Sequence, residues 1–412
     1  MARYTYTNLD HANEEIRLLK LMPGQWDEEI ACSIFHTPLI APKHKTEAKR
    51  LPLEDLRKTL PERWHAGETL GGRYLFFQLG RNVLSSSWDH PVPRFDRALY
   101  ELQPKKASPA YEPEYEALSY TWGPTTEPVV LHVLGQTTTT LGIGVNLAIA
   151  LKNLRCSDSS RTLWVDAICI NQEDVLERNH EINRMKSIYS LAKWTIIWLG
   201  EEADDSTRAL LTLEHFSKQV EFMIGGICGD APGAESLEWW CRDSRLPYDD
   251  FTWSCLIDLL RRPWFSRIWV LQEALLGNPR SIVQCGKTSL LWTALRKAIL
   301  VLARNATLPH DLRSLLASYE PGILPRAMSS LPWLLRWTKS RKCIDPRDKI
   351  YGILGLVSPL IAKGIILNYS MPTPDIYKSA LLSYISITKQ LDLLQQCRVT
   401  QRFDNRPSWI PN

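Results

Sequence analysis

Thr162-Leu-Trp-Val-Asp166 and Trp194-Thr-Ile-Ile-Trp-Leu199 are two short apolar runs on either side of a helix-forming stretch at residues 177–192. Neither run alternates between apolar and polar residues, which is typical of parallel strands buried on both faces of a sheet. The stretch between them repeats apolar residues at helical spacing, at Ile182, Met185, Tyr189 and Ala192. Strand, helix and strand in this order predict an α/β fold in which helices flank a parallel sheet.

The same kinds of element continue on both sides of this unit. Candidate strands lie at residues 116–120, 129–134, 267–270 and 281–285, and candidate helices at 146–154, 206–222, 254–262, 292–303 and 374–394. Earlier in the chain, residues 16–21 and 30–34 are apolar runs separated by a Pro-Gly turn. We expect them to form a hairpin or edge strands within a segment, residues 1–40, that packs with the main domain.

Composition places the chain among ordinary globular proteins. Of its 412 residues, 44% are hydrophobic and 23% are charged, and 49 scattered basic residues against 45 acidic ones give a net charge of +4. No basic tract predicts nucleic-acid binding, and no apolar run approaches the roughly 20 residues that a membrane span needs. The nine cysteines contain no Cys-x-x-Cys pair. This usage predicts reduced thiols and a cytoplasmic protein.

Motifs for metals and for nucleotide phosphates are missing from the sequence. The nine histidines show no His-Glu-x-x-His or comparable spacing, so we predict neither a metal site nor a bound cofactor. No Gly-x-x-x-x-Gly-Lys-Ser/Thr loop occurs, which argues against ATP and GTP as ligands.

A small second unit is expected at residues 56–95. Short strand candidates there are separated by Gly-bearing turns, with Trp64 before the first, Trp88 after the last and Pro91 three residues beyond. This pattern resembles a three-stranded antiparallel WW domain, although the histidine usual after the aromatic strand is replaced. The resemblance implies a groove for a proline-rich peptide at Trp88, with Phe76 or Phe77 as its aromatic partner and Ser86 as the flanking hydroxyl. Residues 41–55 and 96–114 are predicted linkers.

Four blocks of the main domain occur in a fixed order. They are Tyr115-Glu-Ala-Leu-Ser-Tyr-Thr-Trp-Gly123, Leu163-Trp-Val-Asp-Ala-Ile-Cys-Ile-Asn-Gln172 with Glu177-Arg-Asn-His180, Arg262-Pro-Trp-Phe-Ser-Arg-Ile-Trp-Val-Leu-Gln-Glu273, and Asp345-Pro-Arg-Asp-Lys-Ile-Tyr-Gly-Ile-Leu-Gly355. Together they closely resemble the fungal heterokaryon-incompatibility (HET) domain, at residues 115–356. Residues 357–412 are expected to be a helical extension. Because Pro407-Ser-Trp-Ile-Pro-Asn412 is similar to an element inside longer HET proteins, we expect this chain to be shorter than its full-length relatives.

The resemblance implies a role in non-self recognition and fungal innate immunity, in which an activated HET protein triggers growth arrest or programmed cell death. The partners it implies are other incompatibility or NLR-type proteins, together with self-association. Asp345 and Asp348 begin a candidate helix near its positive dipole end, where a structural clamp through Arg347 is the preferred interpretation.

HET domains are themselves thought to be distantly related to TIR domains, so the resemblance implies a TIR-like core and a possible reaction. Enzymatic TIR domains carry a catalytic Glu four residues after a Trp, and Glu273 follows Trp269 at that distance. NAD is then the implied substrate, with Glu273 stabilising an oxocarbenium-like transition state. Ligands of open α/β sheets lie beyond the carboxyl ends of the strands, so Tyr120, Trp122, Gly123 and Asp166 are the candidate substrate-binding residues.

Other interpretations of these residues remain open. Glu273 could cap a helix or pair with Arg262 or Arg267, and Tyr120 and Trp122 could be core residues. Asn171, after Asp166, is expected to cap the next helix. Two functions are therefore carried forward: an NAD-cleaving enzyme, and a non-catalytic death-signalling adaptor that self-associates and recruits partners.

Overall fold

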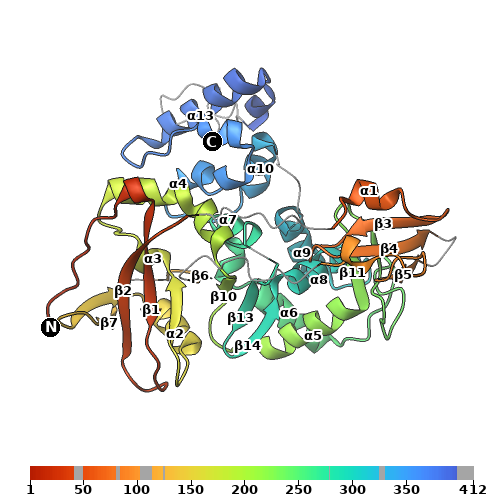
Figure 1. Ribbon diagram of the computed structural model, residues 1–412, viewed down its shortest axis with the longest axis horizontal. Coiled ribbons are helices and arrows are strands. Elements are labelled where there is room, and N and C mark those ends of the chain that lie inside the picture. Colours follow the sequence, from red (N-terminus) through yellow and green to blue (C-terminus); the bar gives the residue numbers. More distant parts are fainter. Residues whose placement is uncertain are drawn as a thin grey trace.

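The apolar runs of the sequence form the strands of a nine-stranded sheet within the described part of the chain (Figure 1). The computed structural model describes residues 1–40, 50–79, 84–102, 114–123, 126–277, 279–323 and 330–396. The strand order is β14-β13-β10-β6-β9-β1-β2-β7-β8. In chain order these strands are β1 (Glu15–Leu21), β2 (Ile30–Pro38), β6 (Glu116–Ser119), β7 (Val129–Val133), β8 (Thr139–Ile143), β9 (Arg161–Trp164), β10 (Thr195–Trp198), β13 (Ile282–Cys285) and β14 (Thr288–Leu291).

The sheet is mixed, which corrects the expectation of a parallel one. Its neighbours β13, β10, β6 and β9 do run parallel, as their buried apolar sequences indicate. Beyond them β1 is antiparallel to both β9 and β2, β2 is parallel to β7, and the edge strands β14 and β8 are antiparallel to their neighbours. The N-terminal hairpin thus lies inside the sheet and not at its edge, because Ile16, Leu18 and Leu19 leave both faces of β1 buried.

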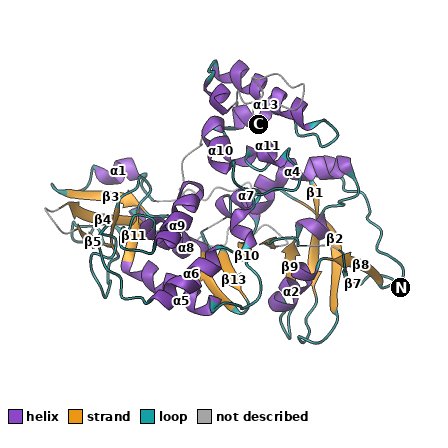
Figure 2. Ribbon diagram, turned by 180° about the vertical axis from the view of Figure 1, so that it is seen from behind, coloured by secondary structure: helices purple, strands orange, loops and turns teal. Residues whose placement is uncertain are grey.

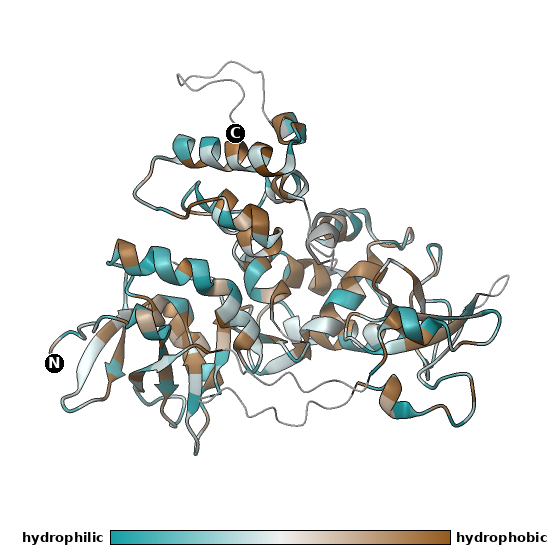
Figure 3. Ribbon diagram, turned by 45° about the horizontal axis from the view of Figure 1, so that its top comes forward, coloured by the Kyte–Doolittle hydropathy of each residue, from teal (hydrophilic) through white to brown (hydrophobic). Residues whose placement is uncertain are grey.

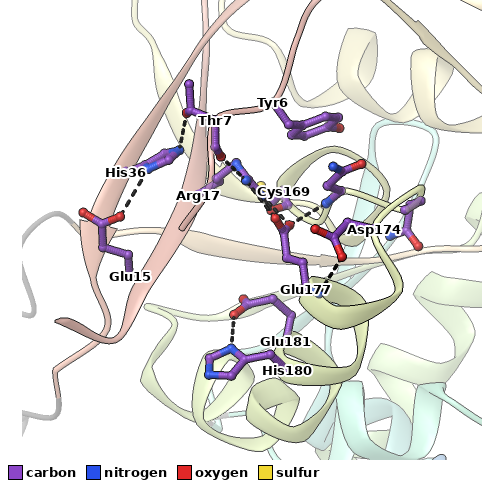
Figure 4. A network of polar contacts seen from close by, with 12 residues as sticks. Tyr6, Thr7, Glu15, Arg17, His36, Cys169, Asp174, Glu177, His180 and Glu181 are labelled. Atoms are coloured by element: carbon purple, nitrogen blue, oxygen red, sulfur yellow. Dashed lines mark hydrogen bonds and ion pairs between the residues drawn. The ribbon is translucent and has the colours of Figure 1, made fainter. Parts of the chain in front are cut away.

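A fully buried charge lies on that central strand. The Arg17 side chain is 0% exposed, and its guanidinium donates to both carboxylate oxygens of Glu177 and to the Cys169 carbonyl oxygen, as Figure 4 shows. Glu177 lies in α4 (Val175–Leu191). Two-pronged pairing of this kind satisfies charges that burial would otherwise leave unsolvated. The pair therefore joins the N-terminal hairpin to α4.

Helices pack around the sheet (Figure 2). α2 (Val145–Leu154) contacts β2 and β7, and α3 (Asp166–Cys169) contacts β1. α7 (Val270–Leu275) packs on α4 and contacts β6 and β10. A second group beside β13 and β14 consists of α5 (Ser206–Gln219), α6 (Asp250–Leu260), α8 (Trp292–Leu302) and α9 (His310–Ile323). Hydrophobic and hydrophilic residues occur side by side along the helices of the molecule, as Figure 3 shows.

The C-terminal helices form a third apolar cluster. They are α10 (Leu331–Thr338), α11 (Asp348–Tyr351), α12 (Pro359–Lys363) and α13 (Thr373–Thr388), with short 3-10 turns at η4 (Leu354–Leu356) and η5 (Asp392–Gln396). Their buried side chains pack with Ile268 and Leu271. The C-terminal helices are thereby joined to the segment that carries Glu273.

The candidate strand at residues 267–270 is wrong. Arg267 makes only an isolated bridge with Lys342, and α7 begins at Val270, after η3 (Pro263–Ser266). The other 3-10 turns are η1 (His11–Asn13) and η2 (Arg97–Leu99). No helix among the described residues is long and apolar enough to cross a membrane.

The smaller unit is a three-stranded antiparallel sheet, as expected: β3 (Trp64–Glu68), β4 (Tyr74–Leu79) and β5 (Leu84–Ser87), with α1 (Leu53–Arg57) against β3. It lies against the hairpin β11 (Val220–Phe222) and β12 (Cys228–Asp230), where Ile224 N–H donates to the Glu68 carbonyl at 2.7 Å. The helix expected at 206–222 therefore ends three residues early, because its last residues pair as β11. Residues 41–49 and 103–113 of the expected linkers, and Pro407–Asn412, lie outside the described residues.

Candidate active site

The parallel strands β6 and β9 end side by side, and polar groups gather beyond their carboxyl ends. Trp122 follows β6 and Asp166 follows β9, and the Trp122 indole Nε1–H donates to Asp166 Oδ2 at 2.8 Å. Gly123 has φ +73°, a backbone conformation that favours glycine over residues with a Cβ. This is the place where ligands of open α/β sheets bind.

A pocket of about 500 Å³ opens here. Of the five expected site residues of the main domain, Trp122, Gly123, Asp166 and Glu273 line it. Tyr120 does not: its side chain is 3% exposed and belongs to the core around the sheet, and its backbone carbonyl accepts a hydrogen bond from Arg267 Nη1. Tyr120 is thus a core residue, as the alternative interpretation held.

Glu273 is buried at the wall of this pocket, on α7. Its Oε2 accepts a hydrogen bond from Ser119 Oγ, which in turn accepts from Trp264 Nε1 at 2.8 Å. Burial raises the pKa of the Glu273 carboxyl to about 7, although the nearby Arg267 charge opposes the rise. A carboxyl group of this kind exchanges between its neutral and ionised forms near neutral pH.

Glu273 takes neither of the structural roles considered above, which were pairing with Arg262 or Arg267 and capping a helix. Arg262 donates to the carbonyl oxygens of Leu199 and Glu201, and Arg267 donates to that of Tyr120. Glu273 forms no ion pair with any residue that the structure describes, and its side chain does not cap α7. The Glu273 carboxyl therefore faces the pocket without an ion pair to any described residue, although the Arg267 charge is nearby.

Asp166 is the second carboxyl of this end of the pocket. Burial raises its pKa, and the Arg267 charge and the Trp122 hydrogen bond oppose that rise. Its Oδ1 also accepts from the Ala167 N–H at 2.7 Å. Asn171 does not cap the following helix, because the Asp174 side chain accepts from the N–H groups at the start of α4.

Several residues of the pocket were not expected from the sequence. They come from α4 and from the C-terminal part of the chain, and they are Arg178, Ile182, Met185, Lys342, Cys343, Ile344, Asp345, Asp348 and Tyr369. Lys342 reaches the pocket because its backbone is hydrogen-bonded to Ser266 and Ile268. The clamp expected at Arg347 is present, since its guanidinium pairs with Asp345 and donates to the Met371 carbonyl oxygen at 2.9 Å.

The expected peptide-binding residues of the small sheet lie on two faces. Phe76 is buried with Tyr100 on one face, whereas Trp88 packs near Phe77 on the other. Phe76 and Trp88 therefore share no groove, because neighbouring residues of a strand point to opposite faces. The Ser86 hydroxyl donates to the Asp230 carbonyl oxygen at 2.8 Å, which places it against the main body.

The chain is similar to known proteins at two levels, a family and a single curated protein. Residues 115–273 match the family described as "Heterokaryon incompatibility protein (HET)". The chain is also 26% identical over 317 residues to "Heterokaryon incompatibility protein 6, OR allele" of Neurospora crassa, a match that covers 63% of this chain and 45% of the relative. No solved structure matches. The two findings support the expected relation to heterokaryon incompatibility proteins.

Proposed function

We propose that the chain acts in heterokaryon incompatibility, and that the pocket at Glu273 cleaves NAD between nicotinamide and ribose. One observation carries the proposal: a buried carboxyl group with a pKa of about 7 faces a pocket of about 500 Å³ and forms no ion pair with any described residue. Perturbed carboxyls in clefts are common at active sites. The match of residues 115–273 to the HET family supports the biological role.

The reaction proposed for this pocket is hydrolysis of one carbon–nitrogen bond. The bond between C1′ of the ribose and the nicotinamide nitrogen breaks, and its electron pair leaves with nicotinamide. The ionised form of Glu273 stabilises the positive charge that develops on the ribose. Water then adds to C1′ and loses a proton, so that the products are nicotinamide, ADP-ribose and one proton. In this proposal the core is TIR-like and Asp166 binds the ribose hydroxyls.

The aromatic side chains of the pocket suit a ligand with planar rings. Trp122 and Trp269 both line it, and aromatic faces stack well on nicotinamide or adenine. Gly123 lines the pocket beside Trp122. With no Cβ, it lets a ligand approach the backbone closely.

Expression in a fungal host tests the proposal in the setting of incompatibility. Wild-type protein should lower cellular NAD and arrest growth or kill the cells, whereas Glu273→Gln at equal expression should do neither. Glu116→Gln is a matched control, because Glu116 lies on β6 but pairs with Arg161 away from the pocket lining. Killing by Glu273→Gln with NAD unchanged would instead establish the non-catalytic adaptor, which acts through self-association and partners such as NLR-type proteins.

A second function concerns the small sheet. We propose that Trp88, which follows β5, contributes to docking of a proline-rich peptide, since Trp88 lines a groove of about 610 Å³ together with residues of α5, α8 and β14. The guanidinium carbon of Arg73 lies 3.8 Å from the centre of the Trp88 ring. Titration of the full chain with proline-rich peptides, compared with Trp88→Ala, should give saturable binding only for the wild type. Equal binding by both proteins would exclude Trp88.

A further inference from the structure

The acidic side chains of the pocket at Glu273 are all held by protein donors. Each carboxyl group in its wall accepts a hydrogen bond or pairs with a cation: Asp166 with Trp122, Glu273 with Ser119, Asp345 with Arg347, and Asp348 with Tyr369. At least one oxygen of each of these carboxyl groups is therefore held by a protein donor before any ligand enters.

Two basic side chains of the same pocket lack such partners. The Arg178 guanidinium lies 4.6 Å from the centre of the Tyr369 ring, and its Nε is buried with no hydrogen-bond partner. Neither Arg178 nor the exposed Lys342 forms an ion pair or a side-chain hydrogen bond within the described ranges. A buried donor without an acceptor is unfavourable. The hydrogen-bond donors of the pocket that lack acceptors thus belong to positively charged side chains.

The surroundings of Arg178 explain why it stays unpaired. Asp345 is the nearby acid, since the Arg178 charge contributes to lowering the pKa of Asp345. However, the Arg347 guanidinium holds both Asp345 oxygens, at 2.6 to 3.1 Å. The contact with the Tyr369 ring holds the Arg178 guanidinium at the pocket wall, and a fork of N–H donors suits phosphate oxygens.

The third cation of the wall is adjacent to Lys342. Arg267 and Lys342 are bridge partners, and both line the pocket. The only side-chain hydrogen bond of Arg267 among the described residues is the one it donates to the Tyr120 carbonyl. Positive charge therefore enters the pocket from two elements, the helix α4 and the bridge between Arg267 and Lys342.

We propose that Arg178 and Lys342 bind a diphosphate group, with Arg267 adding to the local positive charge. The proposal deepens the function proposed above and takes its ligand from it: the diphosphate is that of NAD and of its product ADP-ribose. Arg178 lies beside Tyr369 and Asp345, whereas Glu273 lies beside Ser119, so the phosphate-binding and bond-breaking groups hold different parts of the ligand. Because a diphosphate joins the two ribose units of NAD, one extended ligand can reach both.

Calorimetric titration of the full chain with ADP-ribose tests this site without any need for turnover. Arg178→Gln and Lys342→Gln should each weaken ADP-ribose binding by about tenfold or more, the expected loss of a charge-assisted hydrogen bond to phosphate. Lys186→Gln is the matched control: it removes one positive charge from an exposed position on α4 outside the pocket lining. It should leave binding within about twofold.

Nicotinamide riboside, which lacks the diphosphate, serves as the second probe. Its affinity should be the same in the wild type and both pocket variants. Lys342→Gln keeps the test decisive if Arg178→Gln fails to fold, because Lys342 is exposed. Wild-type affinity for ADP-ribose in Lys342→Gln and in any folded Arg178 variant would overturn the proposal, as would no ADP-ribose binding by the wild type. ADP-ribose binding without NAD cleavage would uphold this site and refute only the catalytic role.

Discussion

Replacing Glu273 with Gln should stabilise the folded protein at alkaline pH. The substitution keeps the size of the side chain but removes its titration. In the folded protein burial raises the pKa of Glu273 from 4.5 to about 7, so the group keeps its proton between these values while the unfolded chain loses it. Stability therefore falls as pH rises through this window, because the unfolded state binds fewer protons than the folded state.

The pKa shift sets the size of this effect. A rise of the pKa from 4.5 to about 7 corresponds to roughly 3 kcal/mol of lost folding free energy above pH 7. Gln carries no charge at any pH and escapes this loss. With an unfolding entropy of about 2.1 cal/mol/K per residue over 412 residues, the gain at pH 8 equals roughly 3 to 4 °C in Tm.

Thermal unfolding of the wild type and Glu273→Gln at pH 5 and pH 8 measures the effect. The difference in Tm should be small at pH 5 and should favour the variant at pH 8. Glu116→Gln is the control of opposite sign, because it breaks the ion pair with Arg161 and should lower Tm at pH 8. Equal Tm differences for Glu273→Gln at both pH values would refute the raised pKa and with it the physical basis of the site.

Three further predictions concern the same fold. Ser119→Ala removes a hydrogen bond that favours the ionised form of Glu273. The midpoint of the pH–rate profile for NAD cleavage should therefore move upward by roughly one pH unit. An unchanged midpoint would show that Ser119 does not donate to Glu273. Glu177→Gln leaves the Arg17 charge buried without its counterion and should cost about 3–5 kcal/mol in urea unfolding, more than the double change with Arg17→Met. Gly67→Ala would place a Cβ 2.5 Å from a methionine sulfur of the adjoining hairpin, and should cost about 1–3 kcal/mol and speed proteolysis of the small sheet.

The parallel part of the sheet and one end of the pocket could be predicted from the sequence because burial leaves a local signature. Strands covered on both faces lose the alternation of apolar and polar residues, as β9 and β10 do. Once two strands are parallel, the residues after them meet at one edge, which brings Trp122 to Asp166. The place of Glu273 came from the family resemblance and not from periodicity.

The N-terminal hairpin could not be placed in the same way. A charged residue on a strand indicates a solvent-facing position, yet Arg17 is fully buried. Its partner Glu177 is 160 residues away in the chain, and no local pattern joins the two. The sequence therefore indicated a position at the edge of the sheet, although strand β1 pairs with β2 on one side and with β9 on the other.

The cationic part of the pocket also depends on contacts between distant segments. Lys342 arrives through its bridge with Arg267, and Tyr369 through the packing of the C-terminal helices. Of these pocket residues, Arg178 alone could have been predicted from a local sequence pattern. It continues the stripe of Ile182 and Met185 by one helical turn, and all three line the pocket.

Nicotinamide release from NAD by the purified full chain is the direct assay of catalysis at Glu273. We expect release by the wild type and by Glu116→Gln, with a rate that rises with pH through about 7 as Glu273 ionises. Glu273→Gln should fold, bind ADP-ribose and release nicotinamide at least about a hundredfold more slowly. Release by Glu273→Gln at the wild-type rate, or none by a wild-type protein that binds ADP-ribose, would contradict catalysis by Glu273.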